Sequence, residues 1–191
     1  MPRTDNLYEL PKNLSAPVDD GACDHLSGMQ LPSVRLRSTA GRIVDLARFP
    51  GRTVVYCYPR TGRPDTDPPK GWNEIPGARG CTPQSCAFRD HYQELQARGA
   101  RVFGLSTQST DYQQEAVERL HLPFELLSDS GLAFTNALRL PTFEVEAMIL
   151  IKRLTLIIRD GRIEKAFYPV FPPDQNAEEV IEWLSRNPLR S

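Results

Sequence analysis

Two cysteines five residues apart are the part of the sequence best suited to chemistry; they lie in the segment GCTPQSCAFRD, residues 80–90. Thr82 can cap a helix whose first position is Pro83. Cys81 would then lie beside the unpaired N–H groups and the positive end of the helix dipole. That environment favours the thiolate, which is the nucleophilic form of cysteine. Cys81 and Cys86 are therefore a candidate reacting couple, with a structural bridge or half of a metal site as the alternatives.

Helix geometry limits which disulfide the two thiols can form. Over five residues a helix rises roughly 7.5 Å and turns past one revolution, which leaves the two side chains on different faces. A disulfide needs Cα atoms within about 7 Å of each other and Cβ atoms that face one another. A static bridge is therefore excluded while the helix is intact. If Cys81 reacts, Cys86 can reach it only after the start of the helix unfolds locally.

The other two cysteines carry weaker signals. Cys57 lies in the apolar run VVYCYP, where cysteine usually packs as a small, inert hydrophobic residue. Cys23 is expected to be incidental, although with His25 it could supply half of a metal site. The chain has three histidines, and none stands in the CxxC or HxxxH patterns that zinc sites use. We therefore expect no metal.

Length and composition are those of one soluble domain. The chain has 191 residues, of which 40% are hydrophobic and 25% charged, which suffices to bury a core. A formal net charge of −1 gives no reason to expect nucleic acid or an anionic membrane as a partner. No stretch approaches the roughly 20 apolar residues of a membrane span, and the N-terminus lacks the apolar core of a secretory signal. We expect a cytoplasmic protein, in which disulfides are transient or catalytic.

Hydrophobic patterning predicts alternating strands and helices. Residues 1–30 lack periodicity and predict an irregular arm, whereas residues 31–191 predict one domain with an inserted loop at residues 60–80. The expected elements are a hairpin over Ser33–Leu46, a buried strand over Thr53–Pro59, a helix from Thr82 to Arg98, a strand over Arg101–Ser106, a helix around Tyr112–Leu120, a short extended piece FELLSDS, a short helix in GLAFTNALRL, a hairpin over Lys152–Pro169, and a C-terminal helix whose start has Asn176 and Glu179 spaced like a capping box.

This order of elements predicts the fold class. Strands interleaved with helices and closed by an antiparallel hairpin form a mixed central β-sheet with helices on both faces. An α/β fold of the thioredoxin-like class has that layout, here with an N-terminal β-hairpin.

The flanking residues make the cysteine segment similar to a known family. GCT-x-x-x-C-x-F-R-D resembles the peroxidatic segment of peroxiredoxins, in particular the peroxiredoxin Q or bacterioferritin-comigratory type. The resemblance extends from about Ser33 to Leu184 and includes VVYCYP, VFGLS, PFELLSD and KRLTLIIRDGRI. It implies a thioredoxin-like fold and a thiol peroxidase that needs no metal or cofactor.

Residue by residue, the resemblance implies that Cys81 is the peroxidatic cysteine and Cys86 the resolving cysteine. Arg153 matches the arginine that the family brings to the active site from the strand before the last hairpin. A guanidinium there would stabilise the thiolate and donate hydrogen bonds to the peroxide oxygens as charge develops. Arg79 and Arg89 could add further positive charge near Cys81.

The chain departs from the family pattern just before Cys81. Family members carry proline, then threonine or serine, then cysteine at close spacing. Here Pro59 ends the matching strand, but the loop 60–80 intervenes, and Ala78 stands three residues before Cys81 without a hydroxyl. We expect Pro59, Ala78 and Thr82 at the substrate pocket. The candidates for the missing hydrogen bond are Thr61, Thr66, Thr82 and a backbone N–H.

Two further segments are assigned to the surroundings of the pocket. The loop 60–80 is expected either to form the pocket rim, with apolar contacts from Trp72 and Ile75, or to be a surface insertion. The segment Glu144–Leu150 could line a pocket for organic peroxides or pack against another subunit.

The sequence therefore predicts a thiol-dependent peroxidase that reduces hydrogen peroxide and organic hydroperoxides. Thioredoxin or a glutaredoxin-type dithiol would reduce the Cys81–Cys86 bridge, and a monomer or weak homodimer is expected. The alternative is a thioredoxin-fold redox sensor or binding module with the same disulfide switch and no efficient peroxidase activity. Ala78 and the inserted loop keep that alternative open, and the rate of reaction with peroxide distinguishes the two.

Overall fold

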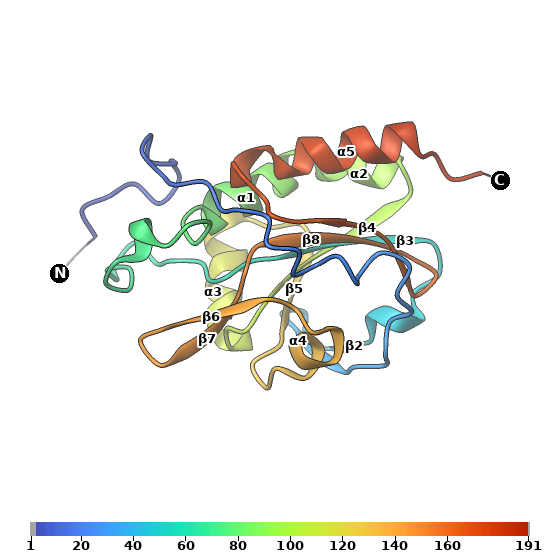
Figure 1. Ribbon diagram of the computed structural model, residues 1–191, viewed down its shortest axis with the longest axis horizontal. Helices are drawn as coiled ribbons and strands as arrows, with labels where there is room; N and C mark the ends of the chain where they lie inside the picture. Colours follow the sequence, from blue (N-terminus) through green and yellow to red (C-terminus); the bar gives the residue numbers. More distant parts are fainter. Residues whose placement is uncertain (1–2, 191) are drawn as a thin grey trace.

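A mixed seven-stranded sheet forms the centre of the computed structural model, which describes residues 3–190 (Figure 1). β3, β4 and β5 run parallel to one another, and the remaining neighbours pair antiparallel. From one edge to the other, the strands are β2 (Ile43–Val44), β1 (Leu36–Ser38), β5 (Glu125–Ser128), β4 (Ala100–Ser106), β3 (Arg52–Cys57), β8 (Leu154–Arg159) and β9 (Arg162–Phe167).

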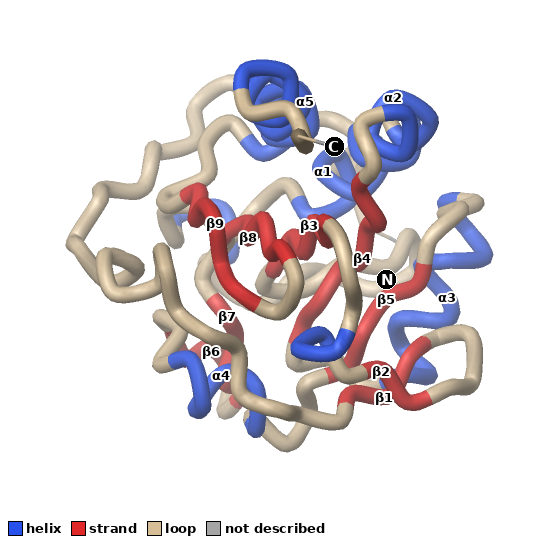
Figure 2. The backbone as a smooth tube through the Cα atoms, turned by 90° about the vertical axis from the view of Figure 1, so that its right-hand side faces the viewer, coloured by secondary structure: helices blue, strands red, loops and turns tan. Residues whose placement is uncertain are grey.

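Helices cover both faces of this sheet. The helices are α1 (Cys81–Asp90), α2 (Tyr92–Ala97), α3 (Thr110–Leu120), α4 (Ala133–Leu138) and α5 (Asn176–Arg186). In Figure 1, α1, α2 and α5 lie above the sheet and α4 lies below it, and Figure 2 shows the same separation from the side. The mixed sheet, the flanking helices and the N-terminal hairpin of β1 and β2 are as predicted.

Strand β3 divides the core into two halves. All six of its residues are buried, as its continuous apolar run predicts for a central strand. Side chains alternate along a strand, so Val54 and Tyr56 pack beneath α1, α2, α3 and α5, while Val55 and Cys57 pack on the opposite face with α4. Tyr58, directly after β3, joins the same apolar cluster as Cys81. The end of β3 therefore lies close to the start of α1, although the loop 60–80 separates them in the sequence.

The helix boundaries near the cysteines differ from the prediction. The single helix expected from Thr82 to Arg98 is divided at His91 into α1 and α2. Helix α1 already includes Cys81, and its N-cap residue is Gly80, with φ 113°. The prediction that Thr82 caps the helix is therefore wrong. Glycine adopts this left-handed region at little cost, so Gly80 can redirect the chain into the helix without a side-chain cap.

The two hairpins in the C-terminal half had different sequence signals. The hairpin predicted over Lys152–Pro169 is confirmed as β8 and β9, which turn at Asp160 and Gly161, both with positive φ. A second hairpin, β6 (Thr142–Val145) and β7 (Met148–Ile151), was not predicted. Its turn residues Glu146 and Ala147 have φ 49° and 64°, yet they lack the Asn-Gly or Asp-Gly signature of such turns.

The segments outside regular elements lie mainly before β1 and between β3 and α1. Residues 3–30 form turns and one isolated bridge, between Gln30 and Arg162. The loop 60–80 contains a short 3₁₀ helix, Trp72–Glu74, and is otherwise irregular. Of the helices between residues 3 and 190, none combines the length and apolar character needed to cross a membrane.

Candidate active site

Cys81 is the first residue of α1, where backbone N–H groups have no partner within the helix. The turn before it depends on Gly80, because an added Cβ would come within 2.8 Å of both Leu10 Cδ2 and Pro173 Cγ. Cys81 is only 3% exposed, and its Sγ lies 3.8 Å from the carbonyl oxygen of Ala78. Its thiol is therefore held inside the protein at the positive end of a helix.

Arg153 brings a second source of positive charge to Cys81. It lies immediately before β8 and is 3% exposed. Its Nη2 donates hydrogen bonds to Cys81 Sγ at 3.2 Å and to the carbonyl oxygen of Ala78 at 3.0 Å. A charged hydrogen bond to sulfur stabilises the thiolate, and the same N–H groups can stabilise charge that develops on a nearby oxygen. The structure thus brings together the two residues that the resemblance paired.

Three buried polar residues hold Arg153 in place, and the sequence analysis did not single out their roles. Arg153 Nη1 donates to Gln84 Oε1 at 2.5 Å. Gln84 Nε2 in turn donates to Asn176 Oδ1 at 3.1 Å, and Thr155 Oγ1 donates to the same oxygen at 2.6 Å. This chain of hydrogen bonds joins α1, α5 and β8 behind the reactive thiol. It fixes the direction of the guanidinium.

The interpretation of Asn176 as part of a capping box is wrong. Gln175 is the N-cap residue of α5, and its side chain makes no capping hydrogen bond. Asn176 is fully buried, and its side chain accepts hydrogen bonds from Gln84 and Thr155 instead. Burying a polar side chain without hydrogen-bond partners costs free energy, and the hydrogen bonds to Gln84 and Thr155 offset that cost for Asn176.

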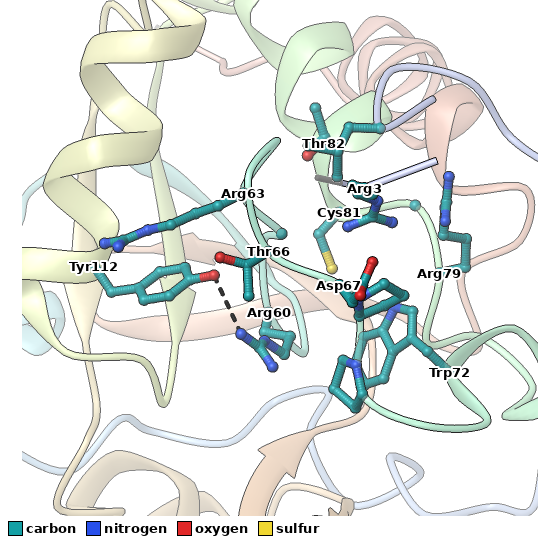
Figure 3. Close-up of a pocket in the computed structure, with 15 residues that line it drawn as sticks. Arg3, Arg60, Arg63, Thr66, Asp67, Trp72, Arg79, Cys81, Thr82 and Tyr112 are labelled. Carbon is teal, nitrogen blue, oxygen red and sulfur yellow. Dashed lines mark hydrogen bonds between the residues drawn. The ribbon is translucent and has the colours of Figure 1, made fainter. Parts of the chain in front are cut away.

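A small pocket surrounds the Cys81 thiol (Figure 3). Its cavity volume is about 20 Å³, little more than one water molecule requires. The Cys81 sulfur points into this space in Figure 3. The residues labelled there come from the N-terminal arm (Arg3), the loop 60–80 (Arg60, Arg63, Thr66, Asp67, Trp72, Arg79), the start of α1 (Cys81, Thr82) and α3 (Tyr112).

The predicted pocket residues have different positions relative to this cavity. Thr82 lines it, and its buried Oγ1 has no hydrogen-bond partner among residues 3–190. Pro59 and Ala78 are buried and do not line it; Ala78 contributes through the carbonyl oxygen that accepts from Arg153. Of the other two threonines considered, Thr66 lines the pocket, whereas Thr61 is hydrogen-bonded to Gln108.

The loop 60–80 forms a wall of the pocket, as one of the two interpretations held. Trp72 lines the cavity and also packs with Ala78 and Leu150 in a small apolar cluster that Ile75 borders. Leu150 belongs to β7, so the hairpin of β6 and β7 supports this wall. The apolar contacts of Trp72 therefore anchor the middle of the loop to the rest of the domain.

Cys86 lies within α1, five residues after Cys81, and is half-buried. Both cysteines are free thiols, as expected while the helix is intact. Burial raises the pKa of the Cys86 thiol, and the positive charge of Arg89 offsets part of that increase. Arg89 thus influences Cys86, and it is hydrogen-bonded to Asp90 and to the carbonyl oxygen of Leu120 rather than placed at the Cys81 pocket.

The remaining cysteines lie away from the Cys81 pocket. Cys57 is fully buried, and burial raises its pKa far above the usual range. Burial, together with the negative charge of Asp20, raises the pKa of Cys23 to about 12. His25 is hydrogen-bonded to the carbonyl oxygen of Leu138. Among residues 3–190, no group of three or more histidine, cysteine or acidic side chains is arranged to hold a metal ion.

Comparison with known proteins places the chain in a family. Residues 26–181 match the family model described as Redoxin. The chain belongs to the redoxin family. A chloroplastic peroxiredoxin Q from Oryza sativa subsp. japonica is 30% identical over 158 residues, which cover 82% of this chain and 65% of the relative. Another peroxiredoxin Q, from Sedum lineare, is 29% identical over a match that covers 82% of this chain and 76% of the relative. The chain spans about 65% of the length of the rice relative.

Solved structures show the same fold. The peroxidoxin BcpB of Mycobacterium tuberculosis matches with a TM-score of 0.70 at 23% identity, covering 87% of this chain and all of that one. A bacterioferritin comigratory protein of Xanthomonas campestris matches with a TM-score of 0.63 at 19% identity, and the match covers 92% of this chain and 98% of that one. The predicted thioredoxin-like fold and the resemblance to peroxiredoxins of the Q type are confirmed.

Proposed function

We propose that this redoxin is a thiol peroxidase in which Cys81 reacts with peroxide and Cys86 resolves the product. One observation carries the proposal: Cys81 Sγ lies at the N-terminus of α1, 3.2 Å from a buried guanidinium nitrogen of Arg153, in a small pocket. An ordinary buried cysteine has no charged donor at its sulfur. This arrangement favours a nucleophilic thiolate and aims hydrogen bonds at its reaction partner.

In the first step, the Cys81 thiolate attacks one oxygen of the peroxide. An S–O bond forms as the O–O bond breaks, so the sulfur is oxidised by two electrons and the peroxide is reduced. The departing oxygen carries the electron pair and is protonated to water, or to an alcohol from an organic hydroperoxide. Arg153 stabilises the charge on that oxygen, and Cys81 is left as a sulfenic acid.

In the second step, the Cys86 thiolate attacks the sulfenic sulfur. An S–S bond forms and hydroxide leaves, taking up a proton to become water. Because both residues lie in α1, this step requires the first turns of the helix to open. An external dithiol then reduces the bridge by exchange and is itself oxidised to a disulfide. Thioredoxin or a glutaredoxin is the proposed donor, and the cytoplasmic location remains a prediction.

The pocket favours hydrogen peroxide as the substrate. The cavity of about 20 Å³ accepts a molecule with two heavy atoms more readily than an organic hydroperoxide. The bacterioferritin comigratory protein of Xanthomonas campestris is described as having alkyl peroxide reduction activity. We propose that this chain also reduces organic hydroperoxides when the pocket opens.

Replacing Cys81 with serine tests the proposal. The assay measures the concentration of peroxide over time in the presence of excess dithiol. We expect Cys81→Ser to abolish peroxide consumption in this assay. Cys86→Ser serves as the matched control, since it should still consume one equivalent of peroxide. Peroxide reduction that survived in Cys81→Ser would contradict the proposal. A wild-type protein that reacts with peroxide no faster than a free thiol would favour the redox-sensor alternative.

A further inference from the structure

Residues 3–10 of the N-terminal arm, here termed the cover, lie across the mouth of the Cys81 pocket. Arg3 and Leu7 line the pocket together with Cys81. Leu7 is 7% exposed although it belongs to an irregular segment, so it is packed against the domain. The cover precedes the residues that match the redoxin family, 26–181. The family core therefore does not account for it.

Arg79 fastens the cover to the residues that lead into α1. Its Nη1 donates to the carboxylate of Asp5, and its Nη2 donates to the carbonyl oxygens of Asn6 at 2.7 Å and Glu9 at 3.4 Å. The Arg79 side chain is 5% exposed and that of Asp5 is 35% exposed, so the ion pair is partly buried. Hydrogen bonds from Arg3 and Arg79 hold the pKa of Asp5 well below its usual range, so the ion pair persists at acidic pH.

The loop 60–80 holds the cover from the other side. Arg119 donates to Tyr8 Oη at 3.3 Å and to the carbonyl oxygen of Gly62 at 2.9 Å, which links the two segments. Gly62 has no Cβ where the cover passes; a Cβ there would come within 2.9 Å of Leu7 Cδ2 and would also contact Arg3. The cover and the loop therefore fit closely at Gly62.

The cover also reaches the second cysteine. Tyr8, Glu9 and Leu10 line a surface pocket together with Pro83 and Cys86. A single segment thus lies over both thiols, and Leu10 additionally packs against Gly80 at the start of α1. Opening of the first turns of α1 must therefore disturb the contacts of the cover.

We infer that the cover determines which peroxides reach Cys81: hydrogen peroxide enters beneath it, whereas hydroperoxides with bulky organic groups are excluded until it shifts. Leu7 is the specificity-determining side chain, because it is an apolar residue of the cover that lines the same small pocket as the Cys81 thiol. This inference rests on the proposed peroxidase function and adds the substrate class to it.

The test compares two peroxides with the full-length chain. Second-order rate constants for Cys81 oxidation are measured by stopped flow with hydrogen peroxide and with cumene hydroperoxide. We expect Leu7→Ala to raise the ratio of the cumene hydroperoxide rate to the hydrogen peroxide rate about tenfold, which corresponds to ~1.4 kcal/mol of steric cost removed. Leu189→Ala removes the same atoms from an exposed site near the other end of the chain and should leave the ratio unchanged.

A second variant releases the cover without creating a cavity. Asp5→Asn weakens the ion pair with Arg79 and should raise the same ratio, while Asp111→Asn, an exposed acidic residue on α3, should not. If hydrogen peroxide is reduced but neither Leu7→Ala nor Asp5→Asn changes the ratio, the inference is overturned and the peroxidase function stands. If the wild-type protein reduces neither peroxide, the proposed function itself fails, and the inference fails with it.

Discussion

Replacing Arg153 with alanine removes the donor that lies closest to the reacting sulfur. Arg153 Nη2 is 3.2 Å from Cys81 Sγ, in a site where both residues are almost fully buried. Removing one preorganised donor from a developing charge typically costs about 10²–10³ in rate, or ~2.7–4 kcal/mol. We expect the second-order rate constant for Cys81 oxidation by hydrogen peroxide to fall by about two to three orders of magnitude, as measured by stopped flow.

The same substitution should also lower stability. The guanidinium pairs with Gln84 Oε1 and with the carbonyl oxygens of Ala78 and Arg79, at 2.5, 3.0 and 3.3 Å. A buried acceptor left without a partner costs about 1–3 kcal/mol. We therefore expect Arg153→Ala to lower the free energy of unfolding, as measured by urea denaturation. The same substitution at an exposed arginine should leave the free energy of unfolding unchanged. The kinetic assay must be run where circular dichroism shows that the variant is folded.

Two comparisons separate catalysis from folding. Arg159→Ala removes an arginine side chain from β8 that is 42% exposed, and it should change neither the peroxide rate nor stability. Alkylation of Cys81 by iodoacetamide requires a thiolate but breaks no O–O bond, so Arg153→Ala should slow alkylation less than peroxide reduction. A folded Arg153→Ala protein with an unchanged peroxide rate would refute the role assigned to Arg153.

Three further predictions concern Cys86 and the residues behind Arg153. Cys86→Ser should retain the first reaction with peroxide but lose repeated turnover with thioredoxin; sustained turnover would show that another thiol resolves Cys81. Gln84→Met should lower the peroxide rate about tenfold, since the hydrogen bond to Arg153 is worth ~1.5–3 kcal/mol and part of that energy positions the guanidinium in the transition state; an unchanged rate would make Gln84 purely structural. Disulfide formation, followed by rapid quench, should accelerate as pH rises toward and above the usual cysteine pKa of about 8.5, because burial raises the pKa of Cys86 in the folded helix. The protonated Cys86 thiol stabilises the folded helix below the usual cysteine pKa, and this stabilisation is lost as pH rises through the raised pKa of Cys86. A rate of disulfide formation that did not change with pH would contradict this prediction.

The reactive segment could be located from the sequence because its signals are local. Glycine before Cys81, a helix starting nearby and a second cysteine five residues later all lie within one short stretch. The wrong cap shows the limit of such reasoning: Thr82 is a good N-cap residue by type, but Gly80 takes the position because its left-handed φ redirects the chain one residue earlier.

The support of the site could not be predicted in the same way. Gln84 and Asn176 are 92 residues apart, and nothing in their immediate neighbours shows that α1 and α5 place them 3.1 Å from each other. The cover is a similar case, because residues 3–10 have no periodic pattern and are ordered by contacts with Arg79 and Arg119. Long-range packing decides these positions, whereas sequence patterns report mainly on local structure.

Rapid-quench labelling of the reduced protein, mixed with equimolar hydrogen peroxide and analysed by peptide mapping, tests the central role of Cys81 most directly. The predicted result is fast and selective loss of the Cys81 thiol, followed by a Cys81–Cys86 disulfide, while Cys23 and Cys57 remain reduced. Slow and similar loss of all four thiols would contradict an activated Cys81 and would leave Arg153 and the pocket without a catalytic role.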